Sequence, residues 1–77
     1  MFDDKEFDNF AKLMEDGIIE NTKYYDNTWK TEDVSFLEHR LSAKYNEFIM
    51  TKKPSKLISL ANLAMMLYIR YIKQKLE

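Results

Sequence analysis

The chain has 77 residues, 12 basic and 13 acidic side chains, a net charge of −1, one histidine and no cysteine. A chain this short forms one domain with a marginal core, which is usually reinforced by disulfides, a metal or a partner subunit. The missing cysteines and the single histidine exclude disulfides and thiolate or histidine-rich metal sites within one chain, so we expect the reinforcement to come from a partner subunit.

The first predicted helix covers about residues 4–21. Its acidic first turn suits the positive end of the helix dipole. Gly17 falls inside the pattern, so the helix either ends there or continues to Tyr25. The side chains that recur at helical spacing on one face are Phe7, Phe10, Ala11, Met14 and Ile18.

The second predicted helix covers about residues 32–50, with Thr31 as its N-cap. Its opposite face is polar and carries His39, which we interpret as an ordinary surface histidine. The apolar stripe of this helix comprises Val34, Leu37, Leu41, Tyr45 and Phe48.

The third predicted helix covers about residues 54–75, with Pro54 in its first turn, where proline is favoured. One narrow stripe is polar, and almost everything else up to Ile72 is apolar. A helix that is apolar nearly all round is buried nearly all round, and two short helices cannot cover it. The sequence therefore predicts an all-α, antiparallel helical bundle that is completed by self-association as a homodimer or tetramer. The residues expected at the subunit contact are Leu63, Met66, Leu67 and Tyr71.

The polar stripe of the third helix contains Ser59, Asn62, Arg70 and Lys73, together with Met66. If Asn62 is buried, its amide needs hydrogen-bond partners. We then expect it to pair with Asn62 of the other copy, with Glu38, or with a ligand or water. In the alternative interpretation the stripe faces solvent and Asn62 needs no partner.

Charge is distributed unevenly, because residues 1–20 have a net charge of −5 and residues 50–77 a net charge of +5. The two ends should attract each other, within one subunit or between two. The balance of charge argues against a nucleic-acid partner. The N-terminus is acidic and the most apolar stretch, residues 57–69, is too short for a bilayer. We therefore expect a soluble, cytoplasmic protein with no membrane partner.

Four residues are candidates for binding a ligand, and each also has a structural interpretation. Trp29 either stacks on a base, with Tyr24 and Tyr25, or caps the core. Lys56 belongs to a lysine cluster that contacts phosphate or is simply solvated. Glu38 borders the apolar stripe of the second helix and is either a ligand-binding residue or a solvated surface charge. The fourth candidate is Asn62.

No catalytic or metal-binding residue is predicted. Glu38 and Glu47 lie nine residues apart, about half a turn out of phase, and the third helix has no acid before Glu77.

Two stretches resemble the MazG-like all-α nucleotide pyrophosphohydrolases, which include small phage and archaeal relatives. Leu60-Ala61-Asn62-Leu63-Ala64-Met65-Met66-Leu67-Tyr68 is similar to the segment that follows the second acidic motif of that family. Lys23-Tyr24-Tyr25-Asp26-Asn27-Thr28-Trp29 resembles the connection before its second helix. The likeness covers about residues 20–72.

The resemblance implies magnesium-dependent hydrolysis of a nucleoside triphosphate to a monophosphate and pyrophosphate, in a dimer or tetramer. The family binds magnesium through Glu-x-x-Glu on one helix and Glu-x-x-Asp on the next. The matching positions in this chain are Lys44-Tyr45-Asn46-Glu47 and Lys56-Leu57-Ile58-Ser59, so three of the four carboxylates are absent.

We therefore expect a protein that binds itself, another protein or a nucleotide without catalysis and without a cofactor. The first alternative is an active enzyme with magnesium, and the second is a small nucleic-acid-binding dimer.

Overall fold

The structure, a computed structural model, describes residues 4–20 and 27–76. These residues form three α-helices and one short 3-10 helix, and no strand, so the all-α prediction is confirmed. The helices lie within two residues of the predicted bounds. In chain order the elements are α1 (Asp4–Glu20), η1 (Asn27–Lys30), α3 (Val34–Thr51) and α4 (Pro54–Leu76).

Helix α1 continues through Gly17 instead of ending there. Its first turn carries Asp4 and Glu6, which interact favourably with the exposed N–H groups at the start of a helix. The predicted continuation to Tyr25, and the candidate aromatic residues Tyr24 and Tyr25, fall on residues 21–26, outside the described residues.

Helix α3 begins two residues later than predicted, and its N-cap is Asp33, not Thr31. The Asp33 carboxylate accepts a hydrogen bond from the backbone N–H of Ser35 at 3.0 Å, which lowers the pKa of Asp33. Glu32 is held in the connection, because its carboxylate pairs with Arg40 at 3.1 Å and its carbonyl accepts a hydrogen bond from Arg70. The helix therefore begins beyond Glu32, and the side chain next to Val34 caps it.

A two-residue connection joins α3 to α4. Lys52 ends α3 in the left-handed conformation, with φ 55° and ψ 26°, and its N–H donates to the carbonyl of Phe48 at 2.6 Å. Pro54 then begins α4, where its missing N–H costs nothing. So short a connection makes α3 and α4 antiparallel neighbours.

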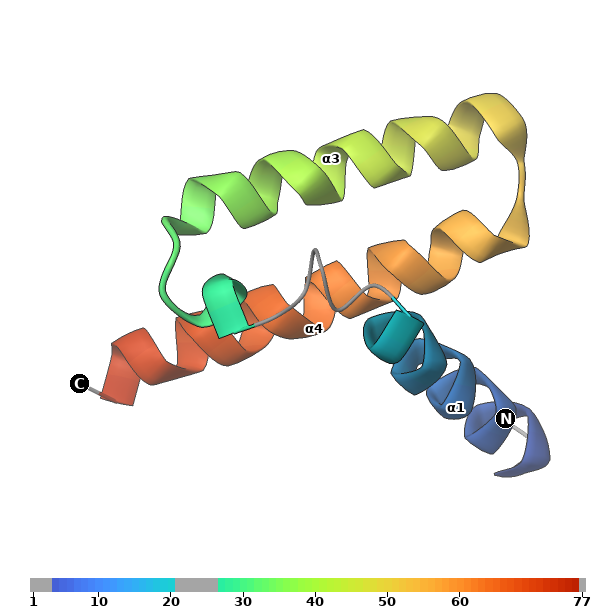
Figure 1. Cartoon of the computed structure of the whole chain (residues 1–77), viewed down its shortest axis with the longest axis horizontal. Helices are drawn as coiled ribbons and strands as arrows, with labels where there is room; N and C mark the ends of the chain where they lie inside the picture. The colour runs from blue at the N-terminus through green and yellow to red at the C-terminus, as the bar shows by residue number, and fades with distance from the viewer. Residues whose placement is uncertain (1–3, 21–26, 77) are drawn as a thin grey trace.

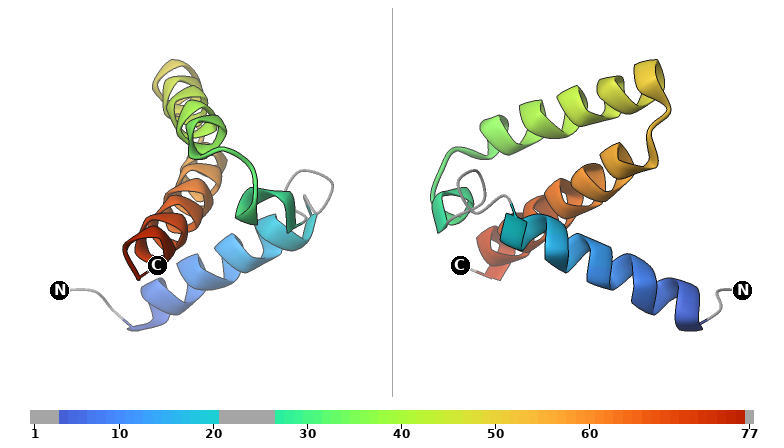
Figure 2. Two further views of the ribbon diagram at one scale, coloured as in Figure 1. Left: turned by 90° about the vertical axis from the view of Figure 1, so that its left-hand side faces the viewer. Right: turned by 45° about the vertical axis from the view of Figure 1, so that its right-hand side comes forward.

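Helix α4 is central, because α3, α1 and η1 all pack against it. Figures 1 and 2 show α3 and α4 side by side and running in opposite directions, whereas α1 crosses α4 steeply and extends away from it. A bundle that includes a second copy stays a prediction.

The core is small and lies mainly between α3 and α4. Its buried members are Leu37, Leu63, Met66 and Leu67, and the partly buried side chains packed against them are Ile18, Trp29, Val34 and Leu41.

Candidate binding site

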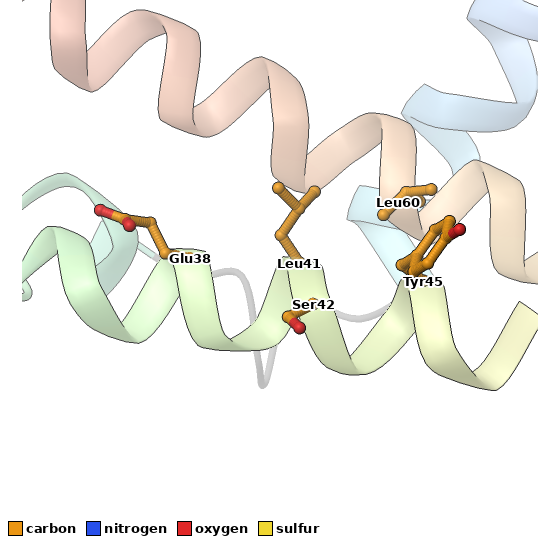
Figure 3. Close-up of a pocket in the computed structure, with 5 residues that line it drawn as sticks. All are labelled: Glu38, Leu41, Ser42, Tyr45 and Leu60. Atoms are coloured by element: carbon orange, nitrogen blue, oxygen red, sulfur yellow. The ribbon is translucent and has the colours of Figure 1, made fainter.

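A shallow groove runs between α3 and α4, with a volume of about 510 Å³. Leu41 and Tyr45 lie one turn apart on α3, and Leu60 faces them from α4 (Figure 3). Glu38 and Ser42 complete the lining, with Glu38 at one end. The groove thus offers apolar walls and one carboxylate, a lining suited to an apolar side chain or a helix face.

The carboxylate of Glu38 is engaged by α4. The Tyr71 hydroxyl donates a hydrogen bond to Glu38 Oε1 at 3.0 Å. This hydrogen bond and the negative charge of Glu38 raise the pKa of Tyr71. Glu38 therefore lines the groove as the acceptor of an internal hydrogen bond, and Tyr71, 46% exposed, lies beside it.

A cluster of opposite charges occupies the end of the α3–α4 hairpin near the turn. Lys44 Nζ lies 3.1 Å from Glu47 Oε2, and Lys56 Nζ lies 4.0 Å from Glu47 Oε1. The hydrogen bond from Lys44, helped by the charges of both lysines, lowers the pKa of Glu47. Within residues 4–20 and 27–76, no group of three or more His, Cys, Asp or Glu side chains is arranged to hold a metal.

Asn62 is buried, with 1% of its surface exposed, and it anchors α1 to α4. Its Nδ2 donates a hydrogen bond to the carbonyl oxygen of Met14 at 3.0 Å. A methyl group at Gly17 would lie 3.3 Å from Asn62 Nδ2, so glycine permits this close crossing. The partner of Nδ2 is thus backbone of α1 and not Glu38. Pairing with Asn62 of a second copy, or with a ligand or water, stays a prediction.

Arg70 holds the 3-10 helix and the start of α3 against α4. Its Nη1 donates to the carbonyl oxygens of Trp29 at 2.8 Å and Glu32 at 2.6 Å. The interpretation of the polar stripe as a solvent-facing surface is therefore wrong for Asn62, Met66 and Arg70. These residues face α1, η1 and the core. Sequence reasoning missed the role of Arg70, although an arginine on so apolar a helix was a signal that acceptors lie nearby.

The four predicted ligand-binding residues do not gather in one place. Trp29 packs against the core, as its structural interpretation expected, and Lys30 Nζ lies 5.8 Å from the centre of its ring. Lys56 belongs to the charged cluster and Asn62 to the α1 crossing. Only Glu38 lines the groove.

Three of the four predicted interface residues are already covered within one chain. Leu63 is 0%, Met66 1% and Leu67 8% exposed. They therefore have little surface left for a second copy, and a subunit contact must use other side chains. Of the four, only Tyr71 remains substantially exposed.

Comparison with known proteins found no matching family model, no similar curated protein and no similar solved structure. The resemblance to the MazG-like family thus rests on the residues of this chain alone. Among the described helices, none combines the length and apolarity needed to cross a bilayer.

Proposed function

We propose that this protein is a non-catalytic, MazG-like helical protein that functions by binding, and that its first partner is a second copy of the same chain. The observation that carries the proposal is the imbalance between buried and exposed apolar side chains. Only four apolar residues are buried among the described ones. The large apolar residues left exposed are Phe7, Phe10, Leu13, Ile19, Phe36, Tyr45, Ile49, Met50, Leu57, Met65, Tyr68 and Tyr71.

The accessible surface supports the same proposal. It measures 6252 Å² for a chain of 9.3 kDa, whereas a folded monomer of that mass exposes about 5,000 Å². Much of α4 contributes to this excess, because Leu57, Met65 and Tyr68 lie on the face that α3 and α1 leave open. Exposed apolar side chains on one face of a helix are typical of a protein-binding surface.

The charged cluster supports a role without catalysis. Lys44, Glu47 and Lys56 are the positions that the resemblance matches to magnesium ligands, and they lie together across α3 and α4. Two ammonium groups therefore stand where the family has carboxylates, and they neutralise the one carboxylate present. Magnesium requires several hard oxygen ligands, and this cluster supplies a single carboxylate, which already pairs with Lys44 and Lys56.

Sedimentation velocity at micromolar concentration tests the proposed self-association. We expect a dimer or a tetramer, because association covers apolar surface that one chain leaves in water. A single species of 9.3 kDa would contradict it.

Two assays test the proposed lack of catalysis. A panel of nucleoside triphosphates with magnesium or manganese should release no pyrophosphate above background. Turnover that is lost in Glu38→Ala or Glu47→Ala would instead support an active enzyme. In the second assay, the triple variant Lys44→Glu, Lys56→Glu and Ser59→Asp should bind magnesium in calorimetry where the natural chain does not. A triple variant that folds but binds no magnesium would contradict the MazG-like alignment.

A further inference from the structure

Besides the open face of α4, the described residues leave two further apolar surfaces uncovered, and these two differ in shape. The first is the α1 stripe, defined as Phe7 and Phe10, which are 62% and 41% exposed. The second is the groove between α3 and α4, lined by Leu41, Tyr45 and Leu60 with Glu38 and Ser42. One surface is a ridge on a helix and the other is a hollow between two helices.

The α1 stripe continues a contact that the chain already makes. Phe7, Phe10, Met14 and Ile18 follow one another along the same face of α1. Ile18 packs against the core, and the Met14 carbonyl accepts the hydrogen bond from Asn62. Because α1 crosses α4 steeply, its N-terminal half extends beyond the hairpin (Figure 2, right). The same apolar face thus passes from a covered half to an uncovered one.

The chain's own α1 does not fill the groove. Leu60 and Asn62 are two residues apart on α4, and in an α-helix that spacing turns the side chains about 200° from each other. Asn62 faces α1, so Leu60 and the groove face the other side of α4. The groove is therefore open to a helix from another molecule.

Charge favours α1 as the occupant. Helix α1 carries six acidic residues and two lysines. Four lysines and one acid lie at the turn end of the hairpin, where Lys44 and Lys56 flank Glu47 and the connection contributes Lys52 and Lys53, whereas the acid Glu38 lines the opposite end of the groove. Pairing α1 with α1 would bring two acidic helices together, and pairing groove with groove would leave both α1 stripes in water. A stripe in a groove covers both surfaces and brings opposite charges together.

We propose that the α1 stripe of one copy lies in the α3–α4 groove of a second copy, and that the exchange is reciprocal, so that two copies close a dimer. This inference rests on the self-association proposed above and names the surfaces that carry it. Reciprocity matters because a one-way contact would leave a stripe and a groove free at the ends and would build an open chain of subunits.

Two variants that each disable one surface test the inference by complementation. The stripe variant is Phe7→Gln with Phe10→Gln, and glutamine maintains the helix. The groove variant is Tyr45→Glu, which places an acid where the acidic α1 would lie. Each variant alone should weaken dimerisation by at least about 30-fold, the effect of losing a central interface side chain. An equimolar mixture should recover dimers, because the groove of the first variant can accept the stripe of the second.

The recovered dimer keeps one of its two contacts, so its dissociation constant should lie between those of the natural chain and of the separate variants. Met50→Glu is the matched control, since Met50 is 84% exposed and belongs to neither surface. It should dimerise as the natural chain does. Circular dichroism establishes that each variant folds, and Ser42→Glu, on the groove wall, replaces Tyr45→Glu if that variant does not.

The association measured for the natural chain, the two variants and their mixture distinguishes this inference from the proposed function. If the natural chain is a monomer, both fail. If it dimerises and the stripe variant dimerises equally well, the contact does not use the α1 stripe and the inference is wrong. If the groove variant dimerises equally well, or if the mixture recovers nothing, the contact is between α1 helices or elsewhere, and the inference is again wrong while self-association stands.

Discussion

The α3–α4 hairpin and helix α1 are held in different ways. The hairpin has a two-residue connection and a core of interlocking side chains, with Leu37, Leu63 and Met66 at 0 to 1% exposure. Helix α1 is attached through its C-terminal half, where Met14, Gly17 and Ile18 meet α4. Packing of several buried apolar side chains thus stabilises the hairpin, whereas α1 is positioned by one hydrogen bond, a close crossing and the packing of Ile18.

This difference shows how one small chain combines a stable part with an adaptable one. Stability is not uniform across a structure, and segments with few buried contacts open at lower cost than the core. The hairpin supplies the groove, and α1, which carries the stripe, extends away from the hairpin. The course of the helix is seen in Figure 1. Because α1 is attached through its C-terminal half, its N-terminal half can contact a second molecule while the core between α3 and α4 stays intact.

A substitution in the core of the hairpin should have the largest effect on the free energy of unfolding. Leu37 is fully buried, and Leu37→Ala leaves a cavity where α3 meets α4. We expect the free energy of unfolding to fall by about 3 kcal/mol, most of what a domain of this size has. Urea unfolding followed by circular dichroism measures the change.

The neighbouring residue provides the control for this substitution. Phe36 is 60% exposed on the same helix, and Phe36→Ala should change the free energy of unfolding by less than about 0.5 kcal/mol. Equal losses in the two variants would show that the interior of the protein does not lie between α3 and α4.

Removing the anchor of α1 should have a smaller and more local effect. Asn62→Ala deletes the hydrogen bond to Met14, a loss of about 1 kcal/mol. Hydrogen exchange should accelerate in the amides of α1 and remain unchanged in those of α3. The control is Ser59→Ala, a half-buried position on the same stripe of α4 that should leave α1 protected. Faster exchange throughout α3 would mean that Asn62 supports the whole fold, and the hairpin and α1 would then not be held independently.

The helices could be predicted from the sequence because their signals are local. The apolar spacing of Val34, Leu37 and Leu41, and Pro54 at the start of α4, depend on neighbours within a turn or two. The N-cap of α3 was the exception, because Glu32 is held outside the helix by Arg40 and also by Arg70, which lies 38 residues away in the sequence.

The side-chain pattern of α4 left open which way its polar stripe faces, because it suited a buried Asn62 and an exposed one. Asn62 and Arg70 point inward because backbone carbonyls of Met14, Trp29 and Glu32 accept their hydrogen bonds. Every residue has a backbone carbonyl, so the sequence does not reveal which carbonyls accept these hydrogen bonds. Likewise, an apolar residue such as Leu63 suits a core and a subunit contact equally well, so the sequence could not tell which of them it occupies.

The smallest expected effect comes from a substitution that should stabilise the hairpin and leave α1 unchanged. Lys52 is the only residue other than glycine with a positive φ among the described residues. Glycine adopts this conformation without the clash that a Cβ atom causes, and it is the preferred residue at this position after a helix. Lys52→Gly also removes the contact of Lys52 Nζ with the Phe48 ring, 5.4 Å away, which offsets part of the gain.

We expect a net increase of about 0.5 kcal/mol in the free energy of unfolding, with hydrogen exchange in α1 unchanged. Lys53→Gly, one residue on and outside the left-handed region, should give no increase. If it stabilises the hairpin as much as Lys52→Gly does, relief of the left-handed conformation is not the cause.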